Sequence, residues 1–313
     1  MTAIAFQVVF LLGAAGPAAP PTDTAATAAP TNPVLVELTE KGVPMPDGTA
    51  VKLPLPTVPD GADAAEQARA LTKILPPDRS LAQFTEKSSG APIALKIRTV
   101  RGKEDATFRL IDLGFVAHGR WETLNSDKFA DNFLKAKGNQ ANQKRTLSKS
   151  GFLTKEEMAQ RGLGGATPGM EQRYFYTTFK LFDEVEVSAT RQAVLTKSPG
   201  SLLLAARLDP RFLDDAEYPN QWRSIDAGAA GVPVLGPKQP YRGAGFYVKI
   251  TRLQRPAGAI FIEYHGAFDE PYGWFQGENR LRSKLPLVAD HEVKQFRIKL
   301  GLASKEEEET AEK

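Results

Sequence analysis

The chain has 313 residues, of which 42% are hydrophobic, 40 are lysine or arginine and 37 are aspartate or glutamate. This apolar content is enough for a sizeable core and excludes a wholly disordered chain. The sequence has no cysteine, which excludes disulfides, zinc–thiolate sites and cysteine nucleophiles. A three-histidine metal site would need every histidine of the chain, namely His118, His265 and His291.

The N-terminus has the pattern of a signal peptide. Residues 3–15 (AIAFQVVFLLGAA) form an apolar run that is short for a bilayer span and suits a signal-peptide core. Small residues follow, so residues 1–16 are predicted to be a signal peptide, although the first basic residue is Lys41. The alternative is a short buried helix or strand. We therefore expect an exported protein, periplasmic or extracellular, if the signal is used, and a cytoplasmic one otherwise.

The rest of the chain is predicted to hold one domain between two solvated segments. Residues 17–33 are almost wholly alanine, proline and threonine, which is typical of a disordered tether. Residues 34–303 are predicted to form a single β-rich globular domain, and residues 304–313 (SKEEEETAEK) an acidic solvated tail. No further stretch is apolar enough to span a membrane. The body has only a mild positive charge, which argues against a dedicated nucleic-acid binder.

The first third of the domain is predicted to begin without a helix. Six prolines between Pro33 and Pro59 exclude a helix there and limit any strand to an edge. A helix is predicted over 62–75, with Asp60 as its N-cap. Period-two patterns then predict a hairpin of strands 93–100 and 107–117, the second of them central because it is apolar on both faces.

Two short helices are expected next. Ser126 or Asp127 can cap a helix that contains Phe129 and Phe133, and a capping box at residues 154–157 starts the other.

Strands dominate the next part of the chain. Residues 172–197 alternate and predict one strand, with a bend at the acidic residues 183–186. A turn at 198–200 leads to a partner strand over 201–208.

A second hairpin is predicted from 245–253 and 259–265. Its alternation places Ile250 and Ile262 inward, and Lys249 and Glu263 outward in solvent.

The final element, residues 290–300, fits both helical and strand spacing. Asp290 as an N-cap behind Pro286 favours a helix.

These elements predict an α+β fold: a single, mainly antiparallel sheet of hairpins with a few flanking helices. The alternation of strand and helix that a parallel sheet needs is missing. A β-sandwich is the alternative. The order of elements over about 172–300, hairpins followed by a terminal helix, resembles that of helix-grip lipid-binding domains in outline. The resemblance lies in element order alone, so no residue role is transferred from it.

The strongest candidate site is an acidic segment that contains a histidine. Glu263 and His265 lie two residues apart on one predicted strand and so share a face, and Asp269 and Glu270 follow in the loop. Such a group could bind a metal or act as a general acid and base. The alternative is an ordinary solvent-facing strand that enters an acidic turn. His118 is interpreted as a hydrogen-bonded histidine at a strand end.

Three other features are weaker candidates. The basic run Lys135–Lys149 could attract a polyanion, but it has no aromatic residue for base stacking, and a solvated loop is the simpler interpretation. The glycines of residues 162–165 lack the lysine of a phosphate loop, and Ser150 lacks a base. Aromatic residues crowd the last third and could line a ligand pocket or build the core: Tyr241, Phe246, Tyr247, Phe261, Tyr264, Phe268, Tyr272, Trp274 and Phe275.

Two functions remain open from the sequence. The first is an exported, non-enzymatic binding or envelope-associated protein that holds an apolar or anionic polymeric ligand on its sheet. The second is a hydrolase-type enzyme that uses Glu263, His265, Asp269 or Glu270. The first is favoured because no nucleophile or catalytic motif is present. No metal or cofactor is predicted, and no catalytic residue is assigned.

Overall fold

The structure is a computed structural model, and it describes residues 31–103, 107–124, 150–163, 171–228, 232–276 and 278–311. The predicted signal peptide, most of the tether, the helix at Phe129 and Phe133, and the basic run Lys135–Lys149 lie outside the described residues.

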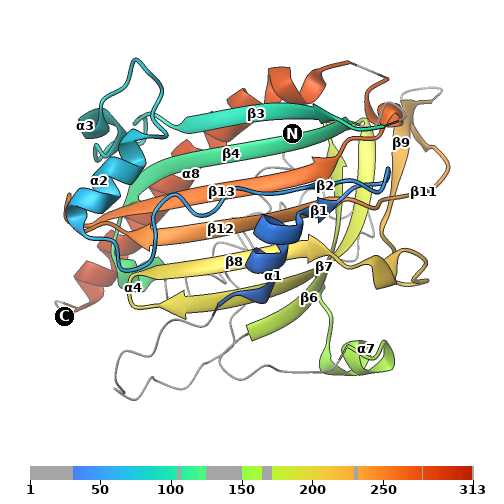
Figure 1. The fold of residues 1–313 in the computed structure, drawn as a ribbon, viewed down its shortest axis with the longest axis horizontal. Helices are drawn as coiled ribbons and strands as arrows, with labels where there is room; N and C mark the ends of the chain where they lie inside the picture. Colours follow the sequence, from blue (N-terminus) through green and yellow to red (C-terminus); the bar gives the residue numbers. More distant parts are fainter. Residues whose placement is uncertain are drawn as a thin grey trace.

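One large antiparallel sheet organises these residues, as the sequence predicted (Figure 1). Its main path runs β10-β9-β7-β8-β12-β13-β4-β3, with β6 and then β5 on the other side of β7 and β11 beside β9. Its strands are β3 (Ala94–Arg101), β4 (Thr107–His118), β5 (Gly151–Phe152), β6 (Glu171–Leu181), β7 (Val185–Ser198), β8 (Ser201–Leu208), β9 (Gln221–Ala227), β10 (Pro233–Leu235), β11 (Gln239–Pro240), β12 (Ala244–Arg252) and β13 (Ala259–Asp269).

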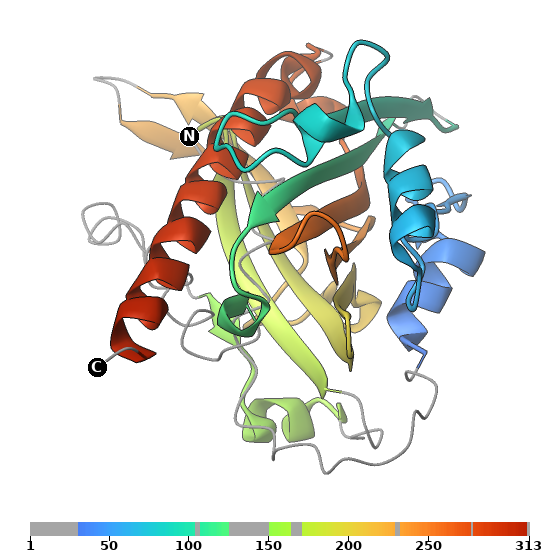
Figure 2. The same ribbon diagram turned by 90° about the vertical axis from the view of Figure 1, so that its left-hand side faces the viewer.

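Helices cover both faces of the sheet. The long C-terminal helix α8 (Arg280–Ala311) lies on one face, and α1 (Pro33–Val36) and α2 (Ala64–Thr72) lie on the other, as Figures 1 and 2 show from two sides. One large sheet therefore lies between helices, beside a separate two-stranded sheet of β1 and β2, and the β-sandwich alternative is wrong. The remaining elements are η2 (Glu37–Lys41), β1 (Val43–Pro44), β2 (Ala50–Val51), α3 (Leu81–Phe84), α4 (Trp121–Leu124), α7 (Lys155–Gln160), η3 (Pro210–Phe212) and η5 (Tyr272–Trp274).

The expectation of no helix between Pro33 and Pro59 is wrong. Asn32 caps α1, because its side-chain oxygen accepts hydrogen bonds from the N–H groups of Val34 and Leu35. Pro33 is tolerated because the first turn of a helix needs no N–H donor there. The following turn packs closely on β12 at Gly245, where an added Cβ would lie 2.5 Å from Leu38. A side chain at Gly245 would therefore force the buried side chains of Leu38 and Val43 to shift.

The long strand predicted over 172–197 is two strands. β6 and β7 form a hairpin whose turn contains Phe182 and Asp183, both with positive φ. The acidic residues that predicted a bend mark this reversal. The prediction failed because apolar alternation continues on both sides of the turn, with no glycine or proline between them.

The hairpins predicted in the first and last thirds are confirmed. β4 is central, between β3 and β13, and Ile250 of β12 lies opposite Ile262 of β13. Both isoleucines belong to the main hydrophobic cluster, to which α8 also contributes. Lys249 and Glu263 do lie on the opposite face, but the prediction that they are exposed is wrong: they are 2% and 1% exposed.

The predicted helix near the C-terminus is confirmed, but its predicted start at Asp290 is wrong. α8 begins at Arg280 and continues through Pro286 to Ala311, into the acidic segment. Phe296 packs edge-on against Phe115 of β4, with ring centroids 5.7 Å apart. The first predicted helix is likewise shorter than expected, since α2 begins after its N-cap Asp63 rather than Asp60.

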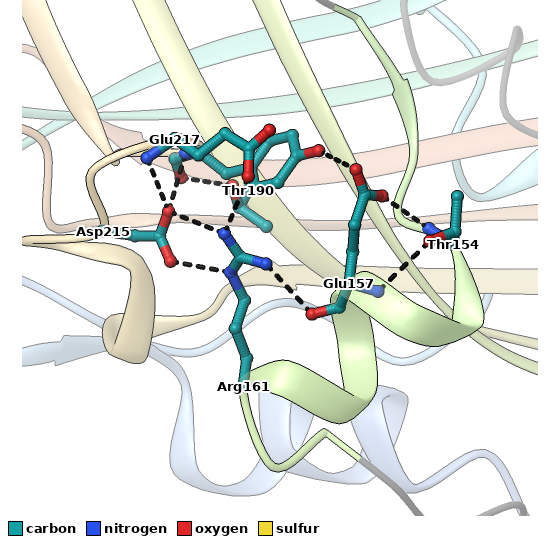
Figure 3. Close-up of polar contacts among 7 residues, drawn as sticks. Thr154, Glu157, Arg161, Thr190, Asp215 and Glu217 are labelled. Atoms are coloured by element: carbon teal, nitrogen blue, oxygen red, sulfur yellow. Dashed lines mark hydrogen bonds and ion pairs between the residues drawn. The ribbon is translucent and has the colours of Figure 1, made fainter.

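The capping box at residues 154–157 is confirmed, and the short helix it starts is held by charged contacts (Figure 3). Arg161, just after α7, donates to both carboxylate oxygens of Asp215 and to Glu217. Glu157 accepts from the backbone N–H of Thr154. These contacts fasten α7 to the connection between β8 and β9.

Candidate functional site

The structure brings together only part of the predicted acidic site. Glu263 and His265 are adjacent on β13, with Nε2 of His265 3.1 Å from Oε2 of Glu263. The third member of this group is Asp112 on β4, whose Oδ1 lies 2.7 Å from Nδ1 of His265. Asp269 and Glu270 lie at the far end of the same strand and make other contacts. The four predicted side chains therefore do not converge.

The His265 imidazole is buried between two carboxylates. Burial lowers its pKa, but the hydrogen bonds and charges of Asp112 and Glu263 outweigh burial and raise it to about 9. At neutral pH the ring is therefore a cation that uses both nitrogens to bind carboxylates. Neither nitrogen remains available as a general base.

The N-terminal chain covers this group. We call residues 54–60 the strap. Its Thr57 N–H donates to Glu263, its Pro54 carbonyl accepts from the hydroxyl of Tyr247, and its Val58 carbonyl accepts from Nζ of Lys249. Lys249 also pairs with Asp60 at 2.8 Å. The polar side chains of this face therefore anchor the strap, which is a structural role.

Glu270 and Asp269 differ in their surroundings. Glu270 forms a buried ion pair with Arg109, whose Nη2 lies 3.2 Å from Oε1 of Glu270. Asp269 has no such cation among the described residues, and burial together with the charges of Glu270 and Asp47 raises its pKa to about 7. In the part of the chain that the structure describes, no three histidine, aspartate or glutamate side chains are placed to hold a metal ion.

The weaker candidates have structural roles. A ring nitrogen of His118 lies 2.9 Å from the Thr85 carbonyl, as expected of a hydrogen-bonded strand-end histidine. The hydroxyl of Ser150 accepts from the Thr178 N–H. Gly162 follows α7 with a positive φ and ends that helix. Most of the aromatic residues of the last third build the core, with Trp274 packed against Tyr241, Phe268, Phe275 and Trp222.

A side chain that the sequence analysis did not name is the most unusual in the interior. Arg191 of β7 is 8% exposed and lies on the same face as Ala189 and Ala193, which belong to the main hydrophobic cluster. Its guanidinium donates one hydrogen bond, from Nη1 to the hydroxyl of Thr177 at 2.7 Å. No carboxylate pairs with it among the described residues.

Aromatic rings surround the Arg191 guanidinium. Its Cζ lies 5.6 Å from the ring centre of Phe175 and 6.0 Å from that of Phe179, both on β6. Burial lowers the pKa of Arg191, and only the hydroxyls of Tyr241 and Tyr264 oppose this effect. Arg191 stays charged because arginine is not deprotonated in proteins. The result is a positive charge in a largely apolar layer with no carboxylate partner among the described residues.

The other buried cations have carboxylate or carbonyl partners that replace the lost solvent. Arg297 of α8 donates to four backbone carbonyls, those of Ser89, Ala91, Pro92 and Val116. Arg109 has Glu270, and Lys249 has Asp60 and the strap. Of the buried arginine and lysine side chains that the structure describes, Arg191 alone has neither an acidic partner nor a set of carbonyls.

Comparison with known proteins adds little to this description. No family model matches the chain, and no curated protein matches it. Among solved structures, the crystal structure of human STARD10 is similar, with a TM-score of 0.33 and 10% sequence identity, over 74% of this chain and 84% of that chain. A similarity this weak assigns neither family nor function. No helix among the described residues combines the length and apolar character of a membrane span.

Proposed function

We propose that the protein is a non-enzymatic binding domain that holds an apolar molecule with one anionic group on the α8-facing side of the sheet. Arg191 binds the anionic group, and the surrounding aromatic side chains contact the apolar part. The observation that carries this proposal is the burial of the Arg191 charge without an acidic partner.

The physical reason is the cost of burying an unpaired charge. Removing an ion from water costs several kcal/mol unless an opposite charge or a set of hydrogen bonds replaces the solvent. One hydroxyl and two ring faces replace only part of that solvation. A carboxylate, sulfonate or phosphate could accept two parallel hydrogen bonds from the guanidinium donors that Thr177 does not use. An anionic ligand therefore supplies the acidic partner that the fold does not provide for Arg191.

Binding is favoured over hydrolysis by the state of His265. The hydrolase hypothesis needs a base, but both ring nitrogens of His265 bind carboxylates, and the strap covers Glu263. The remaining two residues of that hypothesis are separated from His265 along β13, and one of them is the ion-pair partner of Arg109.

The test is calorimetric titration of the full chain with decanoate, which carries one carboxylate and an apolar tail. We expect native protein to bind decanoate and Arg191→Met to bind it at least about tenfold more weakly, because a charge-assisted hydrogen bond contributes about 1.5–3 kcal/mol. Arg69→Ala, an exposed arginine on α2, is the control and should bind as native. Decyltrimethylammonium, with the same tail and a positive charge, should not bind. Equal decanoate affinity in native and Arg191→Met protein would refute the role of Arg191.

We also propose that the protein is exported, which the apolar run at residues 3–15 and the alanine-, proline- and threonine-rich segment after it support. N-terminal sequencing of protein isolated from its native host should then give a first residue between about 14 and 20. Intact Met1 or Thr2 would contradict export by this route.

A further inference from the structure

A surface cavity lies where the β3–β4 hairpin meets the start of α8. It has a volume of about 480 Å³ and is lined by both strands and by the connection from β13 to α8. This volume lies within the roughly 300–1,000 Å³ that small-molecule sites occupy. It lies apart from Arg191, because β13, β12 and β8 separate β4 from β7 in the sheet, a distance of roughly 19 Å at about 4.8 Å per strand.

The cavity is lined by more positive than negative charge. Arg101, Arg109 and Arg282 line it together with one acidic residue, Glu270, so the described lining residues carry a net charge of +2. Arg109 and Glu270 form the buried ion pair, and Arg109 also donates to the hydroxyl of Thr99. This pair makes a fixed, fully occupied part of the wall.

The other two arginines have no partner among the residues that the structure describes. Arg101 and Arg282 are exposed, and neither makes an ion pair or hydrogen bond with any residue that the structure describes. They come from different elements, the end of β3 and the first turn of α8, so the fold brings them to one cavity. Two unpaired guanidinium groups at one site are suited to bind an oxyanion.

The N-terminus of α8 adds to the positive electrostatic potential of the cavity. Asn279, which also lines the cavity, accepts the first hydrogen bond of the helix from Ser283 through its carbonyl. The first N–H groups of a helix have no partner within the helix, and they give its N-terminus a partial positive charge. An anion in the cavity would therefore meet the helix start as well as the two arginines.

We propose that this cavity is a second binding site, and that its ligand is the phosphate ester of a small polar molecule. A phosphate monoester carries a charge of about −1.5 to −2 at neutral pH, which matches the net charge of the lining residues. The cavity is larger than one phosphate group needs. Its remaining wall includes Asn279, for hydrogen bonds, and Tyr272, an exposed aromatic face for a sugar ring.

The test is calorimetric titration of the full chain with glucose 6-phosphate, inorganic phosphate and glucose. We expect glucose 6-phosphate to bind more tightly than inorganic phosphate, and glucose alone to give no measurable heat. Arg101→Ala and Arg282→Ala should each weaken glucose 6-phosphate binding about tenfold. Arg69→Ala and Arg191→Met should leave it unchanged, because neither residue lines the cavity.

A variant expected to bind more tightly is a useful control, because damage to the fold would weaken binding and could not strengthen it. Glu270→Gln removes the negative charge of the lining and frees Arg109, so it should tighten glucose 6-phosphate binding several-fold. Three results would overturn the proposal: no binding of either phosphate compound, native affinity in Arg101→Ala and Arg282→Ala, or tighter binding of inorganic phosphate than of the ester. The last would assign the cavity to free phosphate. Because decanoate binding depends on Arg191, loss of one site leaves the other measurable.

Discussion

At the scale of single residues, the buried cations that the structure describes differ in how the fold satisfies them. His265, Lys249, Arg109 and Arg297 each have carboxylates or carbonyls that replace the lost water, whereas Arg191 has one hydroxyl. Satisfied groups stabilise the fold, and the buried Arg191 is the observation on which the proposed ligand site rests.

The raised pKa of His265 predicts how stability depends on pH. The folded pKa of about 9 exceeds the ordinary histidine value of 6.5, so the folded protein holds a proton that the unfolded chain loses. The stabilisation is complete below about pH 6.5 and is lost as the pH rises through 9. The free energy of unfolding, measured by urea denaturation, should fall by on the order of 3 kcal/mol across this window.

His265→Gln is the control, because it cannot titrate. It should be less stable than native at pH 6 and should show little slope between pH 6.5 and 9. The raised pKa of Asp269 acts in a lower window, between its ordinary value of 3.8 and about 7. An unchanged slope in His265→Gln would show that another group causes the loss.

Part of this site could be predicted from the sequence. Alternation alone places Glu263 and His265 on one face. Asp112 could not be found, because it meets His265 only through the register of β4 with β13. Arg191 did leave a signal: it interrupts the apolar parity of Val185, Val187, Ala189 and Ala193. A single arginine in that series is the kind of exception that a sequence pattern can reveal.

At the scale of elements, the strap helps to bury the face of the sheet opposite α8. The alternation of apolar and polar residues correctly predicted which side chains of β12 and β13 share a face. It does not predict which segment covers each face. The cover comes from the proline-rich segment 54–60, which has no periodic pattern of its own. Burial of Lys249 and Glu263 was therefore beyond what the sequence pattern could predict.

Because the strap buries Glu263, replacing this residue should destabilise the fold, whereas replacing an exposed glutamate would have little effect. Ile262→Ala should cost roughly 2–5 kcal/mol through lost burial and a cavity. Glu263→Ala should cost a comparable amount, roughly 3 kcal/mol, because it leaves the His265 cation with one carboxylate and the Thr57 N–H without its acceptor. Hydrogen exchange at Thr57 should become faster in this variant. Lys96→Ala, at an exposed position of β3, should stay within about 0.5 kcal/mol of native. A cost for Glu263→Ala as small as that of Lys96→Ala would show that the strap does not depend on this contact.

At the scale of the whole molecule, one antiparallel sheet carries a different cover on each face. The strap face combines hydrogen bonds to the strap with two hydrophobic clusters, one of which contains Val58 of the strap beside Val116 and Phe261. The α8 face is apolar, rich in aromatic residues, and contains the unpaired Arg191. The two faces therefore differ in how their buried charged side chains are satisfied.

The most direct test of this account is the free energy of unfolding of Arg191→Met without ligand, compared with native protein by urea denaturation. Methionine fills much of the same space with no charge, so removing an uncompensated buried cation should stabilise the fold by about 1 kcal/mol or more, even though decanoate binding is lost. That combination is expected of a residue kept for binding at the expense of stability. A loss of several kcal/mol in Arg191→Met would instead show that Arg191 supports the fold, and would contradict the assignment of a ligand site to this face.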